Sequence, residues 1–178
     1  MEYKLIRQPR RKKLLLIVNP LCEVIVKAGV FSTQQSIDEF VNSKSEWIRK
    51  QQQYFKNKYH TRISVTQEQR NILKKELLPE MTELVEKYSE IMDVTPKSIK
   101  ITVAEKRWGS CSGRQTICFS YRCAFLSQRC KEYIVIHELC HLKQMNHSQM
   151  FYQLVAKYMP EYREVEKELG GYYIHLQQ

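Results

Sequence analysis

The chain has 178 residues, of which 43% are hydrophobic and 27% are charged, and this composition is typical of a globular protein with one ordinary core. Its formal charge of +10 favours polyanionic partners such as nucleic acid, although a solvated basic surface is the simpler interpretation. Six cysteines without a CxxC pair exclude a disulfide framework, and the apolar run Leu14–Val18 is too short to span a membrane. We therefore expect a cytoplasmic protein with no membrane partner.

The first part of the chain alternates between short aliphatic segments and longer amphipathic stretches. Three segments rich in β-branched and aliphatic residues predict strands arranged as a meander or hairpin, and they cover residues 3–6, 13–18 and 22–27. Apolar side chains at helical spacing then predict one helix over residues 33–57. Strands followed by a helix predict a mixed N-terminal portion.

A second helical stretch begins after Thr66, which forms a capping-box pattern with Gln69. Pro79 lies inside this stretch and removes a backbone donor, so we predict either a kinked helix or two helices. The sequence changes character near residues 93–97. We expect the joint between an N-terminal part (1–96) and a C-terminal part (97–178) at this point, with both parts in one folded unit.

Strands precede helices in the C-terminal part. Alternating apolar and polar residues from Ser98 predict a half-buried strand, which leads into a glycine- and serine-rich segment, Trp108–Gly113, interpreted as a loop or bulge. Ser127 is positioned to cap an apolar, buried helix that we expect to end near Asn146. The remaining predicted elements are a strand at 116–121 and helices at 148–158 and 160–169. Together these elements predict an α+β fold.

The apolar helix carries the pattern His137-Glu138-Leu139-Cys140-His141. Residues four apart on a helix project from the same face, so both imidazoles can bind one ion while Glu138 stands beside them. Catalytic zinc takes three protein ligands and leaves a fourth position for water. His147 follows after five intervening residues and is the candidate third ligand. The sequence therefore predicts one zinc ion per chain.

This arrangement of residue types predicts a zinc-dependent metallopeptidase. Bound zinc lowers the pKa of its water toward about 7 and polarises a carbonyl group, and Glu138 would act as the general base. Imidazoles and a carboxylate on so apolar a helix would be costly to bury without partners, which argues against residues that bind nothing. The expected partner is a protein or peptide substrate.

Four motifs resemble, in their order and spacing, the YgjP-like metallopeptidase family, a group of zincins related to the WLM-type and SprT-like proteases. The motifs are Arg107-Trp108-Gly109-Ser110-Cys111, Ile117–Arg122, Tyr133–Leu142 and Asn146-His147-Ser148. The resemblance implies a zincin-like metallopeptidase domain with a β-rich and helical N-terminal portion. It also implies zinc on His137, His141 and His147, with Glu138 as catalytic base. Ser120 and Ser127 depart from the residues common in the family, which puts the details of substrate contact in question.

The strand expected at Ile99–Lys106 is either an ordinary core strand or an edge strand, and an edge strand beside a protease site can pair with an extended peptide. Trp108, Gly109 and Ser110 are the candidate substrate-binding residues, because we expect the segment that follows this strand to shape the cleft beside it. Proteases of the wider clan act on proteins crosslinked to DNA, and this analogy would give the basic charge a purpose. Two alternatives therefore stay open. One is a basic nucleic-acid-associated protein with a structural or vestigial zinc site, and the other is a DNA-stimulated protease.

Overall fold

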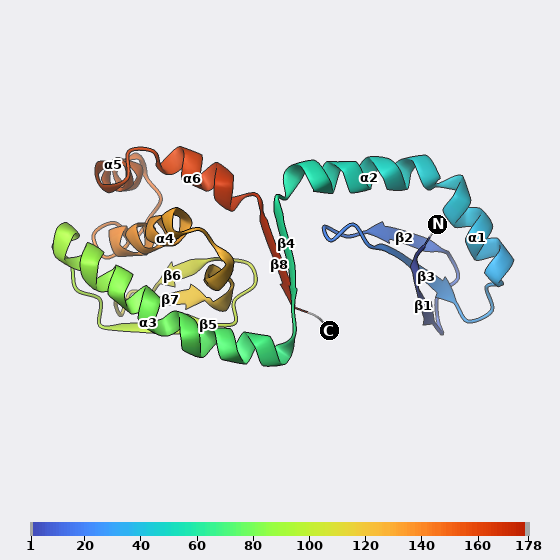
Figure 1. Cartoon of the computed structure of the whole chain (residues 1–178), viewed down its shortest axis with the longest axis horizontal. Coiled ribbons are helices and arrows are strands. Elements are labelled where there is room, and N and C mark those ends of the chain that lie inside the picture. Colours follow the sequence, from blue (N-terminus) through green and yellow to red (C-terminus); the bar gives the residue numbers. More distant parts are fainter. Residues whose placement is uncertain (1, 177–178) are drawn as a thin grey trace. The chain divides into compact units, whose positions relative to one another are not determined.

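A computed structural model describes residues 2–176 and divides the chain into two compact units, Met1–Ile63 and Ser64–Gln178 (Figure 1). This division lies upstream of the joint predicted at residues 93–97. The difference comes from α3 (Gln67–Met92), whose buried side chains belong to the core of the second unit. A long amphipathic helix is assigned to a unit by the core it packs against, and the sequence pattern does not identify that core.

The first unit contains a three-stranded sheet of β1 (Lys4–Gln8), β2 (Leu15–Val18) and β3 (Val24–Gly29). Strands β2 and β3 form an antiparallel hairpin, which was one of the two expected arrangements. Strand β1 pairs in parallel with β3, so the strand order is β1-β3-β2 and the meander, the other alternative, is wrong. Val24 and Val26 are buried, whereas Ile25 between them is half-buried. One face of this sheet therefore contributes most to the core of the unit.

Two helices complete the core of the first unit, where the sequence predicted one helix over residues 33–57. Helix α1 (Gln34–Ser43) is followed by Lys44, which caps it with an N–H bonded to carbonyls of the last turn. Helix α2 (Ser45–Lys58) begins directly after Lys44. The break lets the chain change direction (Figure 1). Buried side chains from both helices join the core, and they are Ile37, Val41 and Ile48.

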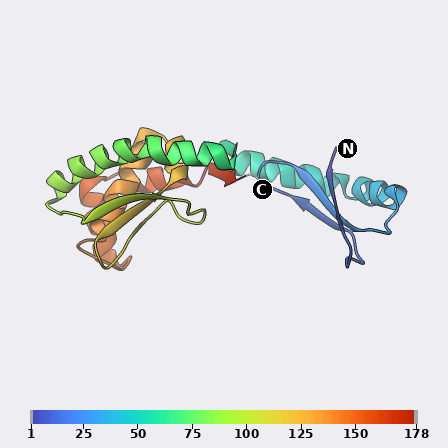
Figure 2. The same cartoon turned by 90° about the horizontal axis from the view of Figure 1, so that it is seen from below.

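The second unit is organised around a sheet of β5 (Ser98–Thr102), β6 (Gly109–Cys111) and β7 (Thr116–Ser120), in the order β5-β7-β6. Strand β7 is central, and it is parallel to β5 and antiparallel to β6. Helix α3 packs against β5 and α4 packs against β6 (Figure 2). A separate two-stranded sheet pairs β4 (Thr61–Val65) with β8 (Tyr172–Leu176), neither of which the sequence predicted.

Helix α3 runs as one helix through Pro79, and the Thr66–Gln69 capping box at its start is confirmed. Its residues Leu77, Met81 and Leu84 are buried in the core of the second unit. The alternative of two separate helices is therefore wrong. Tertiary packing on both sides of the proline compensates for the backbone hydrogen bond that proline removes.

The central helix α4 (Gln128–Cys140) is buried around most of its circumference, as its apolar sequence predicts, and Ser127 caps it. It ends at Cys140 instead of near Asn146, and the chain leaves it through tight turns in which the amides of Leu142 and Lys143 bond to the carbonyls three residues back. Asn146 does not adopt the left-handed conformation with which an asparagine can end a helix. His141 therefore occupies the C-cap position, where the chain leaves the helix.

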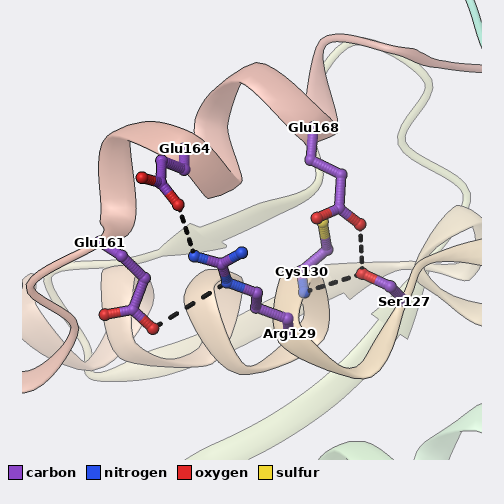
Figure 3. A network of polar contacts seen from close by, with 6 residues as sticks. All are labelled: Ser127, Arg129, Cys130, Glu161, Glu164 and Glu168. Carbon is purple, nitrogen blue, oxygen red and sulfur yellow. Dashed lines mark hydrogen bonds and ion pairs between the residues drawn. The ribbon is translucent and has the colours of Figure 1, made fainter.

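Three further elements surround α4. They are the 3₁₀ helix η1 (Tyr121–Phe125), α5 (Gln149–Tyr158) and α6 (Tyr162–Leu169). Ion pairs and a hydrogen bond hold α6 on α4, from Arg129 to Glu161 and Glu164 and from Ser127 to Glu168 (Figure 3). The predicted α+β class is confirmed. Within residues 2–176, none of the helices has the length and apolar character needed to cross a membrane.

Candidate metal centre and active site

The three predicted histidines converge at the C-terminal end of α4. His137 lies on the last turn of the helix, His141 is its C-cap, and His147 lies in the connection to α5. One ring nitrogen of each residue lies within 4.8 Å of the others, and the Nε2 atoms of His137 and His147 are 3.0 Å apart. Ligand nitrogens of a tetrahedral zinc ion lie about 3.3 Å apart, given bonds of about 2.0–2.1 Å. The donor set therefore fits zinc.

A fully buried phenylalanine packs against all three imidazoles. The ring centroid of Phe151 lies 4.9 Å from that of His137, 4.5 Å from that of His141 and 4.8 Å from that of His147. Phe151 comes from α5, so packing of this helix brings an apolar surface beneath the cluster. The phenylalanine restricts the ring orientations and excludes water from one side of the three donors.

Hydrogen bonds orient two of the imidazoles. The Nδ1 atom of His141 lies 3.1 Å from the Gln144 carbonyl oxygen, so Nδ1 carries the proton and Nε2 keeps its lone pair. The Gln144 amide also donates to Asn146 and Ser148, which stabilises the turn before His147 and α5. Some zinc proteases have a glycine at the third position after the second histidine ligand, where the chain turns. Gln144 occupies that position here, and its side-chain hydrogen bonds stabilise the turn instead. The Nδ1 atom of His137 lies 3.4 Å from the Tyr133 hydroxyl.

Burial favours the neutral, metal-binding form of these side chains. It lowers the pKa of His137 to about 3, and the nearby His141 and His147 contribute in the same direction. Burial also lowers the pKa of His141, although the Gln144 carbonyl opposes this shift. Neutral imidazoles bind metal without first losing a proton.

Glu138 lies beside the cluster and is 5% exposed. Its Oε2 atom is buried and has no hydrogen-bond partner within residues 2–176. Burial raises the pKa of Glu138 to about 8, and the charge of Arg107 opposes this shift. A Cβ atom at Gly109 would lie 2.5 Å from Glu138 Oε1, so the absence of a side chain at Gly109 makes room for the carboxylate.

Strand β6 lies inside the segment that the sequence interpreted as a loop or bulge. The amide of Ser120 bonds to the Trp108 carbonyl, and the amide of Ser112 bonds to the Thr116 carbonyl. In an antiparallel pair, residues that exchange main-chain hydrogen bonds alternate with residues that do not. The two bonds place Gly109 and Cys111 at the positions that do not bond to β7. Their main-chain groups therefore face away from β7, and no other strand of the described residues pairs with β6. The loop prediction missed this open edge because the strand is short and rich in small residues.

The site opens into a cavity of about 460 Å³. The cavity is lined by Trp108, Gly109 and Ser110 together with the three histidines and Glu138, so all of the predicted site residues meet there. Trp108 is held in place by Arg122, whose guanidinium lies 4.1 Å from the centre of the indole ring. Sequence reasoning did not assign roles to Cys111, which also lines the cavity, or to Tyr133. Tyr133 precedes His137 by four residues, and this spacing was an available signal.

Comparisons with known proteins agree with this geometry. The chain matches the YgjP-like metallopeptidase domain over residues 59–172, which is more than half of its length. The chain belongs to the YgjP-like family. This YgjP-like protein is therefore a metallopeptidase, and its histidine cluster fits a zinc site. The family match lies mostly in the second unit, which holds every residue of the cavity.

Two solved structures share similarity with half of the chain. One is the metallopeptidase zymogen abylysin of Pyrococcus abyssi, with 27% identity, a TM-score of 0.47 and coverage of 50% of this chain and 90% of that one. The other is the metallopeptidase zymogen jannalysin of Methanocaldococcus jannaschii, with 21% identity, a TM-score of 0.45 and coverage of 50% and 92%. A comparison with curated proteins finds no match.

Proposed function

We propose that this YgjP-like protein hydrolyses peptide bonds with one zinc ion held by His137, His141 and His147 and with Glu138 as general base. The observation that carries the proposal is the convergence of three imidazoles and a buried carboxylate on one cavity. Three neutral nitrogen donors and an open fourth position are typical of catalytic zinc, whereas structural zinc sites are closed and rich in cysteine.

Zinc bound to these imidazoles supplies Lewis-acid chemistry, which activates water and polarises the scissile carbonyl. Glu138 accepts the proton of the attacking water at Oε2 and later delivers it to the departing amine. The position of this atom supports the assignment, because Oε2 is buried and has no other hydrogen-bond partner within the described residues. A nearby divalent cation favours the ionised form of the carboxylate, which is the form a base requires.

The substrate binds as an extended peptide along β6. The main-chain groups of Gly109 and Cys111 face the open edge and can pair with a peptide backbone, which gives affinity with little sequence preference. Trp108 and Ser110 line the same cavity and shape the space for substrate side chains. This proposal moves the peptide pairing from the strand expected at 99–106 to β6, where the main chain at Gly109 and Cys111 makes the pairing contacts.

Metal analysis and a Glu138→Gln variant, assayed on a peptide library, test this function. We expect about one zinc per chain in both proteins and a loss of cleavage on the order of 10²–10⁴-fold in the variant, since proton transfer is lost while the ligands remain. Glu132→Gln on the same helix is the matched control, because Glu132 pairs with Lys87 on the surface. A zinc-replete wild-type protein that cleaves no member of the library would contradict the proposal.

A second candidate function, association with nucleic acid, is favoured by the distribution of charge. Residues 1–63 contain thirteen lysines and arginines but five aspartates and glutamates, so this unit carries +8 of the total +10. The ion pair Lys50–Glu46 neutralises one of these cations within the described part of the unit. So concentrated a charge favours a polyanionic partner.

Exposed aromatic residues accompany this charge on α2. Trp47 is 43% exposed and Tyr54 is 53% exposed, and their spacing of seven residues places them on one helix face with Lys50 and Lys58. Lys58 Nζ lies 5.6 Å from the centre of the Tyr54 ring. Aromatic side chains interleaved with cations bind single strands by stacking and charge neutralisation.

Binding of a fluorescent single-stranded DNA oligonucleotide, measured over a series of salt concentrations, tests this candidate. We expect affinity to fall steeply with salt, and Trp47→Ala with Tyr54→Ala to weaken binding by about 1–3 kcal/mol per stacked base. If the wild type and the variants bind the oligonucleotide as equally as they bind heparin, which has no bases, charge alone accounts for the binding and stacking does not contribute. Absence of oligonucleotide binding at low salt would exclude the candidate and leave the peptidase function unaffected.

A further inference from the structure

A chain of hydrogen bonds connects α6 to one of the three histidines. The Tyr133 hydroxyl donates to Glu166 Oε1 at 2.6 Å. The oxygen of this hydroxyl also lies 3.4 Å from Nδ1 of His137. Tyr133 is 5% exposed, so water has little access to the centre of this chain. Tyr133 and His137 lie four residues apart on α4, whereas Glu166 comes from α6.

The direction of each hydrogen bond follows from the donor inventory. An ionised carboxylate only accepts, so the single Tyr133 proton points to Glu166. The lone pairs of the hydroxyl oxygen then remain to accept the Nδ1 proton of His137. This arrangement places the lone pair of His137 on Nε2, which is the atom that lies 3.0 Å from Nε2 of His147. Glu166 therefore selects, through Tyr133, the tautomer that presents Nε2 to the cluster.

Helix α6 is held on α4 along both flanks of its buried stripe. The stripe consists of Tyr162, Val165 and Leu169. On one flank, Glu161 and Glu164 pair with Arg129, and Glu168 accepts from Ser127 at 2.5 Å (Figure 3). Helical spacing places Glu166 on the opposite flank. Contacts on both flanks restrict rotation of α6, so the backbone of Glu166 is held where its carboxylate can reach the Tyr133 hydroxyl.

We propose that Tyr133 and Glu166 are positioning residues of the metal centre, which hold His137 in the orientation and tautomer that bind zinc. The inference rests on the proposed zinc site and adds two residues that neither contact the ion nor belong to the HExxH pattern. His141 has a corresponding outer partner in the Gln144 carbonyl. Outer partners of this kind commonly contribute about 10–100-fold to metal affinity.

Zinc affinity of the full chain, measured by competition with a chromophoric chelator, tests the proposal. We expect Tyr133→Phe to bind zinc about 10–100-fold more weakly, because the ring remains while the hydroxyl is lost. Glu166→Gln retains an oxygen that can accept from Tyr133 but loses the charge, so its affinity should fall between those of the wild type and Tyr133→Phe. The matched control is Lys167→Gln, which removes a charge from an exposed position of the same helix and should bind as the wild type does.

Two further measurements separate positioning from a structural role. The double variant Tyr133→Phe, Glu166→Gln should bind zinc as weakly as Tyr133→Phe alone, since both residues act through one chain of hydrogen bonds. The visible spectrum of the cobalt-substituted protein should change in Tyr133→Phe, while the melting temperature of the metal-free protein stays close to that of the wild type. Wild-type zinc affinity in a folded Tyr133→Phe protein would overturn this proposal alone. A wild-type chain that binds no zinc would overturn it together with the zinc-dependent function.

Discussion

The two units of the chain differ in what their charged and polar residues do. Residues 1–63 carry a formal charge of +8, and their cations are mostly exposed. Residues 64–178 are nearly balanced, and their acidic residues make specific contacts such as Glu166 with Tyr133 and Glu80 with Lys131. The family match covers most of the second unit and barely enters the first. Acidic residues of the second unit make internal contacts, whereas the cations of the first unit mostly face solvent.

The two cores should respond differently to equivalent cavities. Phe151→Ala removes a fully buried ring from beneath the three histidines, and we expect about 3–5 kcal/mol of lost stability together with weaker zinc binding. Ile48→Ala in the first unit should cost about 2–5 kcal/mol but leave zinc affinity unchanged. Calorimetry with zinc titration measures both quantities. Equal effects of the two variants on zinc affinity would show that the comparison is wrong.

Two glycines with close neighbours, one in each unit, offer a second contrast. The methyl group of Gly109→Ala would displace the Glu138 carboxylate. Displacement of a catalytic group by about 1 Å can lower the rate about 10²-fold, so we expect a loss of this order in kcat/KM. Alanine at Gly29 would press on the backbone carbonyl of Arg11 in the first unit, which should lower stability and leave peptidase activity unchanged. Peptide assays beside thermal melts of both variants distinguish these outcomes, and an active Gly109→Ala enzyme would argue against the role of Glu138.

Metal removal should affect one unit only. Free zinc at one hundred times its Kd stabilises the folded form by about 2.7 kcal/mol, and a chelator removes this contribution. Because all three candidate ligands lie in the second unit, the thermal transition of that unit should shift down while the transition of the first unit stays in place. Calorimetric scans with and without chelator follow both transitions. A shift of both transitions by the same amount would indicate that the units unfold together.

The smallest effects are expected at ion pairs. Glu80→Gln leaves Lys131 without its 2.5 Å partner, and because the Lys131 side chain is 11% exposed we expect a loss of about 1–3 kcal/mol. Glu46→Gln in the first unit breaks a pair whose two side chains are about three-quarters exposed, at a cost below about 0.5 kcal/mol. Urea unfolding curves measure both changes. A larger effect at Glu46 than at Glu80 would contradict the contrast between surface and buried charge.

Local patterns predicted the elements whose stabilising contacts are also local. The Thr66–Gln69 capping box and the Ser127 cap both join residues three positions apart, and each is confirmed. The four-residue interval between His137 and His141 likewise sets their common face wherever the helix lies. Other predictions failed where distant residues decide the outcome. One helix was expected where Lys44 separates two, and a loop was expected where β6 pairs with β7.

The sequence by itself determined the chemistry of this protein, because zinc-binding residue types at helical spacing and the family motifs are written in the order of the chain. Only the tertiary structure decided how the site is supported. Gly109 lies against Glu138, and Glu166 reaches His137 through Tyr133, across intervals that carry no periodic signal. Such contacts arise when separate elements pack on a common core, and their partners are chosen by the geometry of that packing.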